Sequence, residues 1–199
     1  MNRPSLSWRE RVARLVTEVF APAPTVAAML VIVAWHSTAS LIDALRWGVL
    51  VLIFTPLLPL LYLLYEVRRL RLTDHHVRLR EQRPRILAFA IASIAFLLLV
   101  LVVLDAPSEL VRLVAAGVVG LVSVTLVTLV WKISIHVAVV AGSYVTLAVL
   151  FGWTLLVLLP IVGLTAWSRV ALHDHTPKQV IAGAVLGATV AGIIFGLQG

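Results

Sequence analysis

Long runs of apolar residues recur along almost the whole chain, and this feature constrains the fold more than any other. A transmembrane helix needs about 20 apolar residues at about 1.5 Å rise each. The runs are continuous and not alternating, which favours helices over barrel strands. They lie at residues 19–36, 47–66, 85–104, 110–131, 133–151, 153–170 and 177–197. The sequence therefore predicts an all-α fold, a polytopic transmembrane helix bundle of six to seven spans, with seven as the main expectation.

The composition excludes the main classes of soluble protein. Of 199 residues, 61% are hydrophobic and only 13% are charged, against about 45–50% and about 25% in soluble domains. Cytosolic enzymes and nucleic-acid binders are excluded despite a net charge of +7, because basic residues beside spans set orientation and attract anionic lipid. The chain has no cysteine, so disulfides, thiolate catalysis and thiolate metal sites are absent.

Two units are predicted along the chain. Residues 1–18 contain the mixed basic and apolar stretch Ser7–Val16, which predicts an amphipathic helix at the membrane interface. Residues 19–199 form one transmembrane domain, and residues 19–36 are interpreted as its first span, not a cleaved leader, because apolar runs continue to the end. Tryptophans at the span ends agree with this partition, namely Trp35, Trp47, Trp131, Trp153 and Trp167.

Small residues and prolines make further predictions about the spans. Gly183 with Gly187, and Gly192 with Gly196, form two G-x-x-x-G pairs that predict close helix packing in the last span. Prolines inside spans predict kinks that a packed bundle tolerates, at Pro56, Pro59 and Pro160.

The distribution of basic residues predicts the orientation. Seven crossings place the N-terminus and the connections 67–84, 131–133 and 168–176 on one face. Of the 16 lysines and arginines, only Arg46 and Arg112 lie on the other face. A basic residue that serves a functional site does not indicate orientation. The first face still has more lysines and arginines than the other when the basic residues in and beside the polar clusters are left out of the count. The basic face is therefore predicted to be cytoplasmic.

Polar residues gather in three clusters on that face, at 74–85, 132–136 and 168–175. Each cluster precedes or opens a predicted span, so three positive helix N-termini would point toward one region rich in arginine. Such a region binds anions, and phosphate matches the arginine fork best. Five of the six histidines also lie on this face, His36 being the exception.

The three clusters resemble the signature of the type 2 phosphatidic acid phosphatase superfamily of integral membrane lipid phosphate phosphatases, which reads K-x6-R-P, P-S-G-H and S-R-x5-H-x3-D. This chain has H-x6-R-P at 76–84, I-S-I-H at 133–136 and S-R-x5-H-x3-Q at 168–179. The resemblance covers roughly residues 74–190, and the chain is similar to divergent prokaryotic members, which implies a prokaryotic plasma membrane. Four positions depart from the signature, namely His76, Ile133, Ile135 and Gln179.

The resemblance implies a mechanism that needs neither metal nor cofactor. His175 would attack phosphorus and form a phosphohistidine, and His136 would protonate the leaving oxygen. Arg83, Arg169 and Ser134 would hold the phosphoryl oxygens.

The departures leave several roles open. His76, at the position of the phosphate-binding lysine, is not reliably charged at neutral pH, so Arg78, Arg80 or Lys132 would supply the missing cation. Gln179 either orients His175 or closes the helix start in a capping box at 176–179. Asp174 is a second candidate to orient His175, and Ser134 serves either as a phosphate ligand or as a helix N-cap or as both.

These expectations converge on a phosphatase or diphosphatase that hydrolyses an amphiphilic phosphate at the cytoplasmic interface. Its substrate would be an isoprenyl phosphate or diphosphate, phosphatidic acid or phosphatidylglycerol phosphate, and its other partner the lipid bilayer. The first alternative is a catalytically weak relative that binds or transfers a lipid phosphate. The second is an anion or lipid transporter, which predicts repeated halves with paired broken helices; the sequence contains no such repeat.

Overall fold

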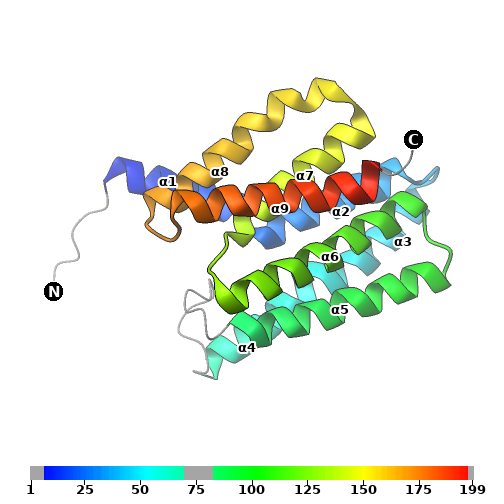
Figure 1. The fold of residues 1–199 in the computed structure, drawn as a ribbon. Helices are drawn as coiled ribbons and strands as arrows, with labels where there is room; N and C mark the ends of the chain where they lie inside the picture. The colour runs from blue at the N-terminus through cyan, green and yellow to red at the C-terminus, as the bar shows by residue number, and fades with distance from the viewer. Residues whose placement is uncertain (1–6, 70–82, 197–199) are drawn as a thin grey trace.

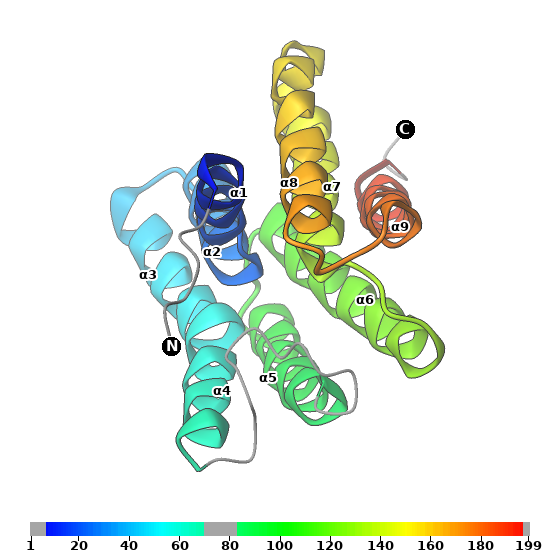
Figure 2. The ribbon, with the colours of Figure 1, turned by 90° about the vertical axis from the view of Figure 1, so that its left-hand side faces the viewer.

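The computed structural model of the chain describes residues 7–69 and 83–196, without the side chains at positions 83, 84, 153 and 156. The described residues form helices and no strand, so the predicted all-helical fold class is confirmed. Figure 1 shows the elements packed along roughly one direction, and Figure 2 shows the same bundle end-on. The α-helices are α1 (Trp8–Val19), α2 (Pro22–His36), α3 (Leu41–Leu52), α4 (Leu58–Arg68), α5 (Arg83–Val103), α6 (Ser108–Val130), α7 (Ile135–Phe151), α8 (Leu159–Ala171) and α9 (Pro177–Gly196).

Four described helical segments are long and apolar enough to cross a membrane, which supports a membrane protein. They are Leu41–Arg68, Arg85–Val103, Ser108–Val130 and Pro177–Gly196. A fifth is counted if α1 and α2, which bend by 43° where they meet, form one span. The apolar helix α7 is shorter, at 17 residues, and α8 has 13. Seven spans therefore remain a prediction.

The prolines act differently in the two places where kinks were predicted. Leu41–Arg68 stays helical through a π-helical segment at Ile53–Leu57 that contains Pro56, because the missing proline N–H widens the hydrogen-bond ladder locally. The Ser93 hydroxyl of α5 donates to the Phe54 carbonyl at 2.5 Å, which satisfies backbone exposed by the irregularity. Pro160, by contrast, lies in the first turn of α8, after a 3₁₀ segment at Trp153–Leu158, and does not kink a continuous helix.

The N-terminal helix α1 packs against the rest of the bundle. Its start has a capping box, in which Ser7 Oγ accepts from the Glu10 N–H and Glu10 Oε2 accepts from the Ser7 N–H. Its buried face includes Thr17, whose hydroxyl donates to Ser168 Oγ of α8 at 3.2 Å. Its position at the membrane interface stays a prediction.

The main apolar core lies between α2, α3, α5 and α6. Val33, Val51, Leu97 and Leu110 are fully buried there. Trp47 is also buried, at 5% exposed, so the prediction that it belongs to an interfacial aromatic belt is wrong. The helix begins at Leu41, six residues before Trp47, and Trp47 lies on the helix face that packs into the core.

Close packing of α7 on α9 confirms the prediction for the first glycine pair. A Cβ added at Gly183 would lie 2.6 Å from the Ser134 carbonyl oxygen, and one added at Gly187 would collide with the Ala138 carbonyl oxygen. Only glycine allows these backbones to approach so closely. The prediction is wrong for Gly192 and Gly196, because an added Cβ at either position meets no described atom within 4 Å.

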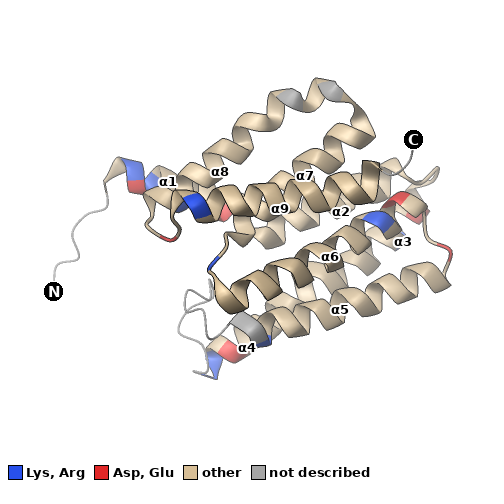
Figure 3. Cartoon of the chain, viewed as in Figure 1, with Lys and Arg blue, Asp and Glu red and all other residues tan. Residues whose placement is uncertain are grey.

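Charged residues gather at the two ends of the bundle (Figure 3). One end collects the last residues of α4, α6 and α8 and the first residues of α5, α7 and α9 (Figure 1). We call it the basic end, defined by Arg68, Arg69, Arg85, Lys132, Arg169 and Lys178. The opposite end carries Arg46 and Arg112, as the sequence predicts.

Candidate functional site

The second and third polar clusters meet at the basic end. Ser134 lies at the N-cap position of α7, and His175 precedes α9. The Ser134 N–H donates to the Gln179 carbonyl at 3.4 Å, which ties the start of α7 to the start of α9. The close approach at Gly183 holds the same two helix starts together. Two helix N-termini with their partial positive charge therefore lie at one place.

Ser134 is fully buried, and its hydroxyl has no hydrogen-bond partner among the described residues. It occupies the N-cap position, yet its side chain makes no capping bond. A buried hydroxyl without a partner costs about 1–3 kcal/mol. Such an arrangement is typical of a group that binds a ligand. Of the two roles expected for Ser134, phosphate ligand and helix N-cap, the side-chain capping bond is not formed.

Arg169 is 5% exposed and pairs with Asp174, with Nη2 at 3.0 Å from Oδ2. The ion pair lies at the end of α8 and ties Arg169 to the loop between α8 and α9, in which Asp174 lies. Asp174, the second candidate to orient His175, forms an ion pair with Arg169.

The loop between α8 and α9 has a defined backbone conformation. His173 has a φ of +56°, the His173 N–H donates to the Val170 carbonyl, and the Asp174 N–H donates to the Arg169 carbonyl. These are the bonds of a Schellman motif, with histidine in the left-handed position that glycine usually takes. The His175 N–H also donates to the Arg169 carbonyl at 3.1 Å, so the loop fixes the backbone of His175 relative to that of Arg169.

The two candidate catalytic histidines occupy different environments. His175 is 7% exposed and lies immediately before Thr176 and α9. His136 is the second residue of α7, half-buried, one residue beyond Ile135. Both therefore belong to the paired helix starts, which is where the sequence places them.

Gln179 makes the contact expected for a helix cap. Its Oε1 accepts from the Thr176 N–H at 3.0 Å, which is the glutamine half of a capping box. Of the two roles that the sequence left open for Gln179, closing the helix start is therefore the one for which the structure records a hydrogen bond.

Lys132 joins the second cluster to the third. Its Nζ donates to the Asp174 carbonyl at 2.6 Å, across 42 residues of sequence. The ammonium group, one of the three candidates to replace the missing lysine, is thus held beside the loop that carries His175.

The first cluster is described only at its end. His76, Arg78 and Arg80 lie outside the described residues. Arg83 begins α5 at the basic end, and its side chain is not described. The predicted phosphate-binding roles of these residues stay predictions.

One residue of this region escaped the sequence reasoning. Thr17 is buried and donates to Ser168 Oγ, and the Ser168 hydroxyl donates in turn to the Thr165 carbonyl at 2.8 Å. The chain of bonds fixes α1 against the part of α8 that carries Arg169. The available signal was the spacing of Ala13, Val16 and Thr17, which share one helix face.

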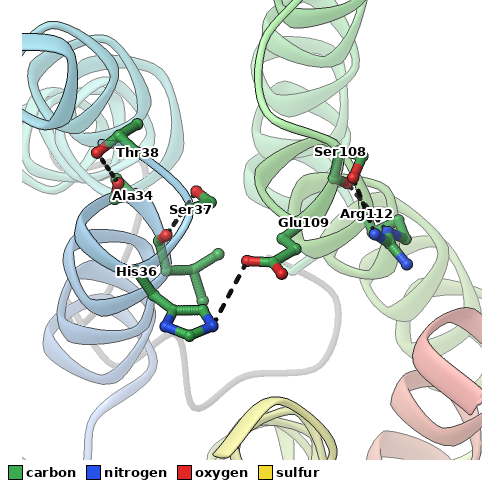
Figure 4. A network of polar contacts seen from close by, with 8 residues as sticks. Ala34, His36, Ser37, Thr38, Ser108, Glu109 and Arg112 are labelled. Atoms are coloured by element: carbon green, nitrogen blue, oxygen red, sulfur yellow. Dashed lines mark hydrogen bonds and ion pairs between the residues drawn. The ribbon is translucent and has the colours of Figure 1, made fainter. Parts of the chain in front are cut away.

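His36, the histidine excluded from the cluster, lies at the opposite end. Figure 4 shows its ring facing Glu109 of α6, with Nε2 at 3.9 Å from Oε2, while Arg112 donates to Ser108. The His36 ring also packs against Phe151 at 4.5 Å between centroids.

In the described part of the chain, no three histidine or acidic side chains are grouped closely enough to hold a metal ion. No protein-family model, no curated protein and no solved structure matches this chain.

Proposed function

We propose that the protein is an integral membrane lipid phosphate phosphatase or diphosphatase whose site lies at the basic end. Its reaction would transfer the phosphoryl group to His175 and then to water, with His136 as the acid that protonates the leaving oxygen. Ser134, Arg169 and the N-termini of α7 and α9 would bind the phosphoryl oxygens, together with Arg83, His76 and Arg78 of the first cluster.

One observation carries this proposal more than any other. Ser134, Arg169 and His175 come from three separate helix ends, are each less than a tenth exposed, and are linked by backbone bonds through Gln179 and the α8–α9 loop. Burial of polar and ionisable groups in an apolar bundle is costly and marks functional sites. The unpartnered Ser134 hydroxyl adds a donor for an anion.

Membrane placement completes the proposal. The bundle would cross the prokaryotic plasma membrane seven times, with α1 at the interface and the basic end in the cytoplasm. The grouping of basic side chains at one end (Figure 3) supports this orientation.

A second candidate function is binding or transfer of a lipid phosphate without hydrolysis. It is favoured by the contacts of the two residues nearest His175 in the motif, since Arg169 is paired with Asp174 and Gln179 caps α9.

The test is phosphate release by the purified protein from farnesyl diphosphate, phosphatidic acid and phosphatidylglycerol phosphate. We expect release by the wild type and none by His175→Ala. The matched control is His173→Asn, which changes an exposed histidine two residues away and keeps a residue type that accepts positive φ. Equal release by His175→Ala and the control would overturn the catalytic role, and binding without release by the wild type would favour the second candidate.

A further inference from the structure

An apolar cavity of about 320 Å³ lies inside the bundle, between α2, the π-helical segment with α4, α5, α6, α7 and α9. Its wall is almost entirely hydrocarbon, and the Thr55 hydroxyl in that wall has no hydrogen-bond partner among the described residues. An ordered water needs about 2–4 polar partners. The wall therefore suits an apolar occupant better than water.

Two glycines of α6 create this space. Gly117 and Gly120 line the cavity, and a Cβ added at Gly117 meets no atom within 4 Å, while one at Gly120 meets only Val190 Cγ1, at 4.0 Å. They differ from Gly183 and Gly187, where the backbone of α7 excludes any side chain. Glycine is less favourable than alanine inside a helix, and at these two positions close packing does not require it. The absence of side chains at Gly117 and Gly120 therefore leaves space for a ligand in the cavity.

The cavity begins beside the candidate site. Ile135 and Ala138 line it, and Ile135 directly follows Ser134 at the start of α7. Leu186 and Gly187 continue the lining along α9, the helix that begins after His175. Gly117 is exposed, so the cavity also reaches the outer surface of α6. A lipid whose phosphate lies at Ser134 would thus have an apolar space directly below its head group.

The volume restricts what fits. An engineered apolar cavity of about 150 Å³ holds one benzene molecule of six carbons. The present cavity is roughly twice that size, which corresponds to on the order of a dozen carbon atoms. That is one hydrocarbon chain, and the two chains of a diacyl lipid would not fit together.

We propose that this cavity holds the single hydrocarbon chain of the substrate, so that the site selects phosphates or diphosphates of one alkyl or prenyl chain over diacyl phosphates. The proposal rests on the proposed function, because it assigns the head group to the site at Ser134, Arg169 and His175. Burial of the chain makes the binding free energy more favourable in proportion to the apolar area removed from water, and KM falls exponentially with that area.

The first experiment measures phosphate release in phosphatidylcholine nanodiscs from dodecyl phosphate, butyl phosphate and dioleoyl phosphatidate. We expect the wild type to have the highest kcat/KM for dodecyl phosphate. Gly117→Leu and Gly120→Leu should raise its KM by about tenfold or more and leave butyl phosphate within about twofold. The matched control is Gly163→Leu in α8, where an added Cβ also meets no atom within 4 Å but which does not line the cavity.

The second experiment does not need turnover. A dodecyl phosphate with a diazirine at the end of its chain is cross-linked to the wild type, to His175→Ala and to Gly120→Leu. We expect labels on cavity residues of α6 and α7 in the first two proteins and their loss in Gly120→Leu.

The outcomes separate the two proposals. Labelling of the cavity without phosphate release from any substrate would end the phosphatase proposal and leave a chain-binding cavity. Phosphate release that is equal for Gly120→Leu and Gly163→Leu, with labels outside the cavity, would overturn the cavity proposal and leave the phosphatase. A higher kcat/KM for dioleoyl phosphatidate than for dodecyl phosphate would also overturn it.

Discussion

The contact between Gly183 and Ser134 allows the link between packing and the candidate site to be tested directly. A Cβ at position 183 would lie 2.6 Å from the Ser134 carbonyl oxygen, and tolerable contact begins at 3.4 Å. The Gly183→Ala variant must therefore separate the starts of α7 and α9 by about 0.8 Å, because the obstructing atom belongs to the backbone and has no rotamer to change.

The expected magnitude follows from this displacement. Overpacking of this kind costs about 1–3 kcal/mol, or roughly 2–12 °C in the thermal midpoint of a chain of this size. The bond from the Ser134 N–H to the Gln179 carbonyl is already 3.4 Å long, so the same movement breaks it. Because Ser134 and His175 lie on the two separated elements, turnover per folded molecule should fall on the order of 10²-fold.

The assay combines thermal unfolding in detergent, followed by size-exclusion chromatography, with phosphate release from the best substrate. Gly192→Ala is the matched control on the same helix, since its added Cβ meets no atom within 4 Å. That variant should be unchanged in activity and more stable by up to about 1 kcal/mol from helix propensity. If Gly183→Ala resembles Gly192→Ala in both measurements, the packing argument is refuted. A loss of stability with normal turnover per folded molecule would support the packing argument and refute its link to the candidate site.

Three further predictions concern the loop and helix start at the basic end. Gln179→Ala should lower unfolding free energy by about 1 kcal/mol through loss of the bond to the Thr176 N–H, while Gln179→Glu keeps an acceptor there and should retain stability. Turnover per folded molecule tests the other role of Gln179: a fall in Gln179→Ala, or a rise in Gln179→Asp, would indicate that the residue orients His175. His173→Gly should raise the thermal midpoint by the equivalent of up to about 1 kcal/mol, because glycine accepts the φ of +56° without strain, whereas an unchanged or lower midpoint would contradict the Schellman assignment. Lys178→Cys, at an exposed position, should react with an impermeant thiol reagent only in inverted membranes; labelling in intact cells would place the basic end outside.

Much of the fold was predictable because it depends on local sequence. Continuous apolar runs predict helices, and the structure has a helix in each of them, although only four segments, or five with the bent pair, meet the length and composition of a span. Helix starts were readable where caps are local, as at Gln179 and at Pro177. The close packing at Gly183 and Gly187 followed from their spacing.

Local patterns were less reliable where the environment determines a residue's role. Trp47 has the amphipathic side chain typical of an interface, but it lies on the buried face of α3 and belongs to the apolar core. Gly192 and Gly196 have the same spacing as the packed pair, yet no described neighbour lies close to them. Spacing specifies a helix face, and only the neighbouring helices decide what that face meets.

The candidate site divides in the same way. Hydropathy alone predicts which polar residues lie at helix ends on one face of the bundle, because it fixes the ends of apolar helices. Tertiary structure sets the contacts among them, such as Lys132 with the Asp174 carbonyl across 42 residues and Thr17 with Ser168 across 151. It also decided that the space at Gly117 and Gly120 is a cavity and not a packed contact. Such pairings depend on the relative positions of helices distant in sequence, which no periodicity within a single helix encodes.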